Sequence, residues 1–481
     1  MDAIDGCGIA HLTSEYEKRQ HLISMGQYAD ALLLHDIALS RGVVDARIVY
    51  GTVTSLHKSG MHHLALQYIR SYPENDDLDN IKYECLSHLG DWGDFVDTSE
   101  MEAKSKVGCY EQSTILKAVR YACLKDCLNV KPTSEAGVKL QKSLNIAKLV
   151  TARLCENLNM ENCQSVYRIV SYLHLFRDIE SYFSVKCDNA SITNLLEEWK
   201  VDNMPSFNDF KHLESLISQR SLILEHIAKT DSVYLSDIHN LQLKYAELGL
   251  RNNRIQMGQR LVAAVKSDQT SKKVVLLESQ ISWAKGHKDI ALSLLRSIVT
   301  QNCEDAKLTA MSLRQYGLWM SECKRETSSD IHKYLQKSLE ALQNNDDVNT
   351  RLKVYYDIAK FADEEYKQVV MYMKSSVFEN KVKCVESMKG TAKSLKTSQQ
   401  AATKYYLLSL KESDDNDLSI FRVISLWLDN PCFEFEDKNS GKFEDFLQEV
   451  PSRKFIAVLP QLAPRLSNDI GSFANLLRII I

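Results

Sequence analysis

A helix-hairpin signature recurs in this chain at the period of tetratricopeptide repeats. Its first copy consists of Gly26, Tyr28, Ala31 and Leu32, which follow the G-x-Y-x-x-A-L spacing of such a hairpin. The glycine lets two helices approach closely, and the alanine lies at their crossing. A second copy begins at Gly60, about 34 residues further on, which is the tetratricopeptide period. One such hairpin cannot bury its apolar face alone, so the spacing predicts a stack of helix pairs.

Further hairpins occur later in the chain, and the composition agrees with them. Trp283 and Gly286, followed by Ala291-Leu292, give the clearest one. Only 17 glycines and 7 prolines occur in 481 residues, below the usual shares of about 7% and 5%, which disfavours turn-rich sandwiches and barrels. We therefore predict an all-α fold, a tetratricopeptide/HEAT-like helical-repeat solenoid. The residues that we expect at the packing points of this repeat are Gly26, Gly60, Trp283, Gly286, Trp319 and Trp427.

The stretch 352–381 shows the helical pattern with one apparent interruption. Apolar residues recur at helical spacing, as at Val354, Ile358 and Phe361. A charged group that includes Asp363 and Lys367 follows them. We interpret this group as the end of one helix and the start of the next, so the stretch predicts a helix pair rather than one long helix.

Three phrases of the sequence are specific enough to compare with known families. One runs from Phe361-Ala362-Asp363 and Tyr366 to the segment 372–381. The second is Phe421-Arg422 followed by 425–428, and the third joins Trp199 to Arg220. Together they resemble the FAT region of the ataxia-telangiectasia mutated (ATM) family of phosphatidylinositol-3-kinase-related protein kinases. The resemblance is strong at 283–427, moderate before it and at 455–465, and weak at 85–144.

This resemblance implies a scaffold with no active site of its own. In the family, the FAT region is a helical-repeat structure just before the kinase domain, which it clamps and regulates, and it takes part in a homodimer. The resemblance also implies DNA-break sensor proteins as partners and a place in nuclear DNA-damage signalling. We expect no direct binding of nucleic acid or membrane. The parent kinase would use ATP with Mg or Mn to phosphorylate Ser or Thr before Gln.

The motifs of kinase chemistry do not occur in the sequence. It has no glycine-rich nucleotide loop, no D-R-H-x-x-N loop and no D-F-G. We therefore expect no catalytic or cofactor-binding residue in this chain, and interpret it as a fragment of an ATM-like kinase or a product lacking the catalytic end. The alternative is a free-standing tetratricopeptide-like adaptor that binds peptides in its groove. The apolar end 479–481 disfavours an adaptor, which should end in a polar capping helix. Other kinases of the superfamily are a lesser alternative.

We expect three segments along the chain. Residues 1–190 would form N-terminal tetratricopeptide-like repeats, and residues 191–430 the central and C-terminal FAT repeats. Residues 431–481 would form the last helices leading toward a kinase domain that is absent from this chain.

Four Ser/Thr-Gln pairs are candidate phosphorylation sites, because the family modifies this dipeptide. They begin at Ser218, Ser279, Thr300 and Ser398. Such short pairs also arise by chance. Ser398 ranks first, since its polar flank is typical of a loop, whereas Ser279 falls inside the best-formed repeat.

Histidines and cysteines offer a possible metal site, which we do not favour. Cys85-x-x-His88 lies downstream of His57, His62 and His63, but zinc ligands usually come in two tight pairs. We interpret these histidines as members of helix faces and predict no metal ligand. Cys123 and Cys127 are one helical turn apart among apolar neighbours, which favours buried core thiols.

Charge and cysteine usage exclude some classes of protein. The formal net charge of −4 disfavours a nucleic-acid-binding surface, which needs clustered Lys and Arg. The 12 cysteines have no framework spacing, as expected in a reducing compartment. No signal-like start and no membrane-spanning apolar run occur, so we expect an intracellular protein.

Overall fold

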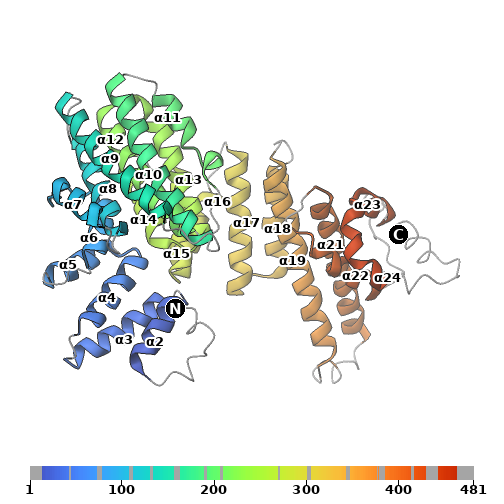
Figure 1. Ribbon diagram of the computed structural model, residues 1–481. Coiled ribbons are helices and arrows are strands. Elements are labelled where there is room, and N and C mark those ends of the chain that lie inside the picture. The colour runs from blue at the N-terminus through green and yellow to red at the C-terminus, as the bar shows by residue number, and fades with distance from the viewer. Residues whose placement is uncertain are drawn as a thin grey trace. The chain divides into compact units, whose positions relative to one another are not determined.

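The fold was analysed in a computed structural model, which describes most of the chain (Figure 1). Helices are the regular secondary structure of the described residues, and no strand occurs among them. The prediction of an all-α helical-repeat fold is therefore confirmed. The described ranges are 14–25, 27–42, 45–72, 78–107, 112–129, 134–156, 163–188, 192–205, 210–268, 271–300, 305–342, 347–375, 378, 385–412, 416–429 and 443–462.

The chain divides into two compact units, Met1–Gly286 and His287–Ile481. The helices of unit 1 are α2 Glu15–Ser24, α3 Tyr28–Ser40, α4 Ala46–Lys58, α5 His62–Ser71, α6 Asp79–Leu89, α7 Thr98–Val107, α8 Gln112–Asn129, α9 Ser134–Glu156, α10 Cys163–Asp188, α11 Ile192–Glu198, η3 Val201–Asn203, α12 Phe210–Thr230, η4 Ser232–Tyr234, α13 Leu235–Arg251, α14 Ile255–Asp268 and α15 Lys272–Ala284. Those of unit 2 are α16 Lys288–Thr300, α17 Ala306–Cys323, α18 Ser328–Ala341, α19 Val348–Met373, α21 Val385–Glu412, α22 Ser419–Asp429, α23 Phe443–Glu449, η5 Ser452–Val458 and α24 Leu459–Leu462.

Several helices begin where the sequence provides an N-cap. At α2, the Glu17 backbone N–H donates to Ser14 Oγ at 3.1 Å, and the Ser14 N–H donates to Glu17 Oε2 at 3.2 Å. Asp305 accepts the N–H of Leu308 at the start of α17. Asp347 does the same for Thr350 at the start of α19. These side chains satisfy N–H groups that have no partner within the helix, and so they fix the helix starts.

The larger apolar cluster of unit 1 extends across position 190. Ile179 of α10, Leu195 of α11 and Ile217 of α12 belong to the same buried cluster. Helices on both sides of this position therefore pack together. A second cluster in this unit, which includes Val53 and Leu86, joins α4, α5, α6 and α8. Unit 1 is thus one packed body rather than a chain of separate hairpins.

Two of the predicted packing glycines adopt a left-handed backbone. Gly60 has φ +79° between α4 and α5, and a Cβ there would lie 3.0 Å from the Gln256 Cβ of α14. Gly286 has φ +85°, but no described atom lies within 4 Å of such a Cβ. The helices on either side of Gly286, α15 and α16, belong to different units, so its predicted role at a helix crossing stays a prediction. The backbone conformation itself favours glycine at this position, since side chains with a Cβ are strained at this φ. Gly26 lies outside the described residues.

The predicted tryptophans differ in burial. Trp427 is fully buried and Trp319 is 5% exposed, whereas Trp283 is only partly buried. Trp319 lies in α17, which packs on α18. There, a Cβ added to Gly317 would lie 3.4 Å from the Tyr334 Cβ, so this glycine marks a close approach of the two helices. Among the described residues, no helix is both long and apolar enough to span a membrane.

Candidate functional site

A layer of polar contacts joins three helices of unit 2 above an apolar core. Helix α19 packs along α21, and α21 packs on α22. The core beneath includes Ala362 of α19, Leu407 of α21 and Trp427 of α22, all of them buried. Two of the phrases that carry the family resemblance, one beginning at Phe361 and one at Phe421, therefore meet in space.

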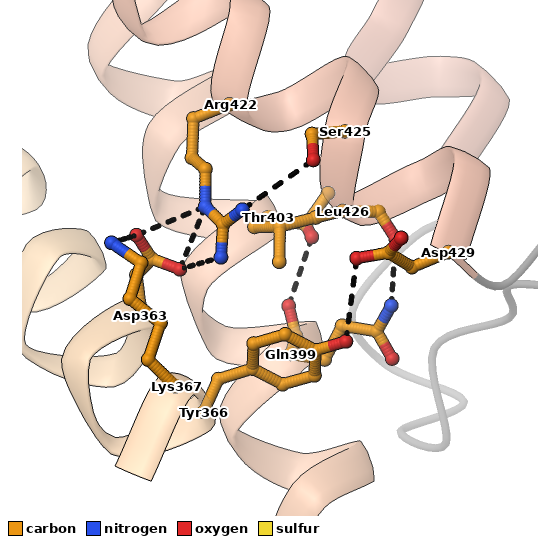
Figure 2. A network of polar contacts seen from close by, with 9 residues as sticks. All are labelled: Asp363, Tyr366, Lys367, Gln399, Thr403, Arg422, Ser425, Leu426 and Asp429. Carbon is orange, nitrogen blue, oxygen red and sulfur yellow. Dashed lines mark hydrogen bonds and ion pairs between the residues drawn. The ribbon is translucent and has the colours of Figure 1, made fainter. Parts of the chain in front are cut away.

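The central contact of this layer is an ion pair between Asp363 of α19 and Arg422 of α22 (Figure 2). Arg422 Nε donates to Asp363 Oδ1 at 2.9 Å, and Nη2 donates to the same oxygen at 2.6 Å. The Asp363 side chain is only 4% exposed, and Lys367 Nζ lies 2.8 Å from its Oδ2. Burial opposes the charge of Arg422, but its hydrogen bonds to Asp363 prevail and raise the pKa of the guanidinium. The pair thus locks α22 onto α19 with a fixed geometry.

A second set of contacts extends the network along α21 and α22. Gln399 Nε2 donates to the Leu426 carbonyl at 2.7 Å, and Thr403 Oγ1 donates to the Gln399 carbonyl at 2.8 Å. Figure 2 shows Tyr366 beside these residues, with its hydroxyl directed at Asp429 Oδ2, 3.5 Å away. Burial, followed by the nearby Asp429 carboxylate, raises the pKa of Tyr366. The polar side chains of this network are hydrogen-bonded to one another or to backbone carbonyls, as expected of contacts that hold packed helices together.

The predicted helix break at 363–367 is wrong. Helix α19 is continuous from Val348 to Met373, and Asp363 lies in its interior with its side chain turned to the core. The charged Asp363 is tolerated inside this helix because Arg422 of α22, 59 residues later in the chain, neutralises it. The remainder of the phrase 372–381 falls partly outside the described residues.

A similar buried pair occurs in unit 1. Arg220 Nε of α12 donates to Asp178 Oδ2 of α10 at 2.6 Å, and both side chains are 4% exposed. The guanidinium lies over the Trp199 ring, 5.3 Å from its centre. Tyr245 completes the group by donating to the Trp199 carbonyl at 2.6 Å. The sequence phrase that paired Trp199 with Arg220 therefore corresponds to a contact, whereas nothing in the sequence marked Asp178 as the partner.

The four Ser/Thr-Gln sites differ in accessibility. Ser279 is fully buried and its Oγ donates to the Leu276 carbonyl at 2.6 Å. Ser218 and Ser398 are each 8% exposed, and only Thr300 is exposed. The expectation that Ser398 lies in a loop is wrong, because it lies within helix α21. Its polar flank forms part of the network around Gln399 rather than a solvated segment.

The histidines and cysteines of unit 1 also differ in their placement. His57, His62 and Cys85 are buried and lie together, while His63 is exposed. Cys123 and Cys127 lie in the α8 part of the large core, where burial raises the pKa of Cys127 to about 12. These last two are inert core thiols in this setting.

Comparison with known proteins decides the family. The model of the FAT domain family matches residues 79–425, which is most of the chain. This chain belongs to the FAT domain family. The prediction of an ATM-type FAT region is thereby confirmed, since the curated relatives are also ATM and Tel1 kinases. "Serine-protein kinase ATM" of Sus scrofa is 23% identical over 97% of this chain. "Serine/threonine-protein kinase tel1" of Schizosaccharomyces pombe is 22% identical over 89% of it.

Solved structures agree on the fold of this FAT domain. The structure described as "FAT and kinase domain of CtTel1" superposes on 98% of the chain with a TM-score of 0.66 and 15% identity. The "Complete CtTel1 dimer with C2 symmetry" gives a TM-score of 0.67 over the same share. The chain spans 17% of the Sus scrofa relative, 16% of the S. pombe relative and 35% of the FAT and kinase structure.

Proposed function

We propose that this FAT domain is the helical scaffold of an ATM/Tel1-like Ser/Thr protein kinase, in which it clamps and regulates the kinase domain. The observation that carries the proposal is the match of nearly the whole chain to a structure whose description names a FAT and a kinase domain. In that structure the region similar to this chain is about a third of the polypeptide, which leaves room for the catalytic part.

The polar layer of unit 2 supports a mechanical role. A scaffold that restrains a kinase must keep its own helices in register, and the Asp363–Arg422 pair does so across two helices far apart in sequence. Packed elements of this kind move as bodies rather than bending continuously. A displacement of one end of unit 2 would therefore move α22 as well, with the contact between α19 and α22 kept intact.

The partners and setting of the scaffold form the finer part of the proposal. The dimer described for CtTel1 supports a second copy of the same protein as one partner. The ATM and Tel1 relatives support a role in nuclear DNA-damage signalling, with DNA-break sensor proteins as further partners. ATP with Mg or Mn would belong to the kinase domain of the parent protein.

The test is made on the protein as the cell produces it. The chromosomal gene is given an epitope tag, the product is isolated, and phosphorylation of a Ser-Gln peptide is measured beside a Ser-Asn peptide. We expect Ser-Gln-specific phosphorylation to co-purify with the tag. An untagged strain gives the background. If a cleanly isolated product phosphorylates the Ser-Gln peptide no faster than this background, the scaffold proposal is wrong.

A further inference from the structure

Three metal-ligating side chains meet where α4, α5 and α6 join in unit 1. His57 lies in the last turn of α4, His62 opens α5, and Cys85 lies in α6. The left-handed turn at Gly60 folds α5 back on α4 and so brings His62 beside His57. All three side chains are buried, at 8%, 3% and 0% exposure respectively.

The atoms that face one another are the ones that bind metals. His57 Nδ1 lies 3.3 Å from His62 Nδ1 and 3.4 Å from Cys85 Sγ, and His62 Nδ1 lies 3.8 Å from the same sulfur. Zinc binds nitrogen at about 2.0 to 2.1 Å and thiolate at about 2.3 Å, so tetrahedral geometry separates two nitrogens by ~3.4 Å and a nitrogen from sulfur by ~3.6 Å. The three observed separations match one tetrahedral ion within about 0.2 Å.

The surroundings have the features of a metal site. His57 Nε2 lies 3.5 Å from Glu84 Oε2, and Lys117 Nζ holds the same carboxylate oxygen at 2.7 Å. A carboxylate on the outer nitrogen of a ligating histidine fixes its tautomer and orientation. The His88 ring stacks on the His62 ring with centroids 4.5 Å apart, and its Nδ1 is buried with no hydrogen-bond partner.

Without a metal, the three side chains face one another as hydrogen-bond partners at 3.3 to 3.8 Å. Two imidazole nitrogens and a thiol converge, and the outer Nε2 of His62 is buried with no partner. A bound metal would give the two Nδ1 atoms and the Cys85 sulfur a common partner, which offsets the cost of burying these atoms.

We propose that His57, His62 and Cys85 form a structural Zn²⁺ site in this FAT domain. On binding, the Cys85 thiol loses its proton to solvent and the sulfur forms the Zn–S bond, while the two Nδ1 atoms donate their lone pairs. The three side chains fill three positions of a tetrahedral ion, and a water molecule would take the fourth. The ion ties the α4–α5 hairpin to α6 and so fixes the hairpin to the rest of unit 1.

The experiment uses the untagged protein, purified without chelators in buffers that contain trace zinc. Metal analysis should find about one zinc per chain in the wild type. Cys85→Ser and His62→Gln should lose most of it, while His63→Gln, one residue away and exposed, should retain it. A chelator should lower the thermal midpoint of the wild type and of the His63 variant, and leave that of the Cys85 variant unchanged.

A second measurement keeps the test decisive if a ligand variant fails to fold. Wild-type protein stripped of metal is titrated with Co²⁺, and tetrahedral thiolate binding gives visible d–d bands together with a thiolate charge-transfer band. These bands support the site. Wild-type protein that contains less than about a tenth of an equivalent of zinc and shows no such bands overturns it, and so does a folded Cys85→Ser variant with undiminished zinc.

Discussion

Arg422 of α22 donates to the Asp363 carboxylate of α19 through two nitrogens, Nε and Nη2, and Nη2 lies 2.6 Å from Oδ1. The pair has one buried and one partly exposed member, since the Asp363 side chain is 4% exposed and that of Arg422 is 28% exposed. Two segments that carry the family resemblance are thus joined by a single contact. Its strength can be measured.

Replacing Arg422 by Ala should lower the free energy of unfolding by about 3 kcal/mol, because it leaves the Asp363 carboxylate buried without its main partner. Chemical denaturation of the full chain, followed by helix circular dichroism, measures the change. Lys367→Ala is the matched control: it also removes a cation from Asp363, but this lysine is 51% exposed and should contribute about 1 kcal/mol or less. Equal losses in the two variants would contradict the special role of Arg422.

The buried ring of His35 should make stability fall in mild acid. Burial, assisted by Arg19, lowers its pKa from 6.5 to about 4. Between these values the unfolded chain binds a proton that the folded chain does not. The free energy of unfolding is therefore not reduced by His35 above pH 6.5. It falls as the pH drops toward 4, and the loss is about 2 kcal/mol at pH 5.

His35→Phe tests this pH dependence, because it keeps a flat ring against Gly51 and cannot titrate. A Cβ added to Gly51 would lie 2.5 Å from the His35 ring, so this packing is close. Urea denaturation at pH 7 and pH 5 should show a smaller difference in the variant than in the wild type. His287→Phe, at an exposed position, should keep the wild-type difference. An unchanged difference in His35→Phe would show that other groups cause the acid sensitivity.

Gly60 and Gly286 have similar backbone angles but different surroundings, so Ala substitutions at these positions separate two effects. Gly286→Ala should lower the free energy of unfolding by about 1 kcal/mol, because a Cβ is strained at positive φ. Gly60→Ala should lower the free energy of unfolding by more, because its Cβ would also make a close steric contact with Gln256. The thermal midpoints of both variants measure this, and a larger loss at Gly286 would contradict the assignment.

The sequence predicted what depends on local pattern and missed what depends on distant partners. The helical class was predictable from the hairpin signature and the low glycine and proline content. The charged group at Asp363 was misread as a break, because the residue that neutralises it comes from another helix. The grouping of His57, His62 and Cys85 was not predicted for the same reason: the two histidines lie on either side of a turn, and the cysteine comes from a third helix.

Burial should decide which Ser/Thr-Gln site a kinase can modify. Thr300 is exposed at the end of α16, whereas Ser279 is fully buried in α15. A kinase must bind its target in an extended form, so Ser279 requires local unfolding, and every 1.4 kcal/mol of opening cost lowers the rate about tenfold. With a Ser/Thr-Gln-directed kinase and mass spectrometry, the folded chain should be modified at Thr300 more than about tenfold faster than at Ser279. A proteolytic digest of the same chain provides the control, because there both sites are unfolded and their rates should approach each other. If Ser279 is modified as fast in the folded chain as in the digest, α15 opens readily, and the burial of Ser279 does not protect it.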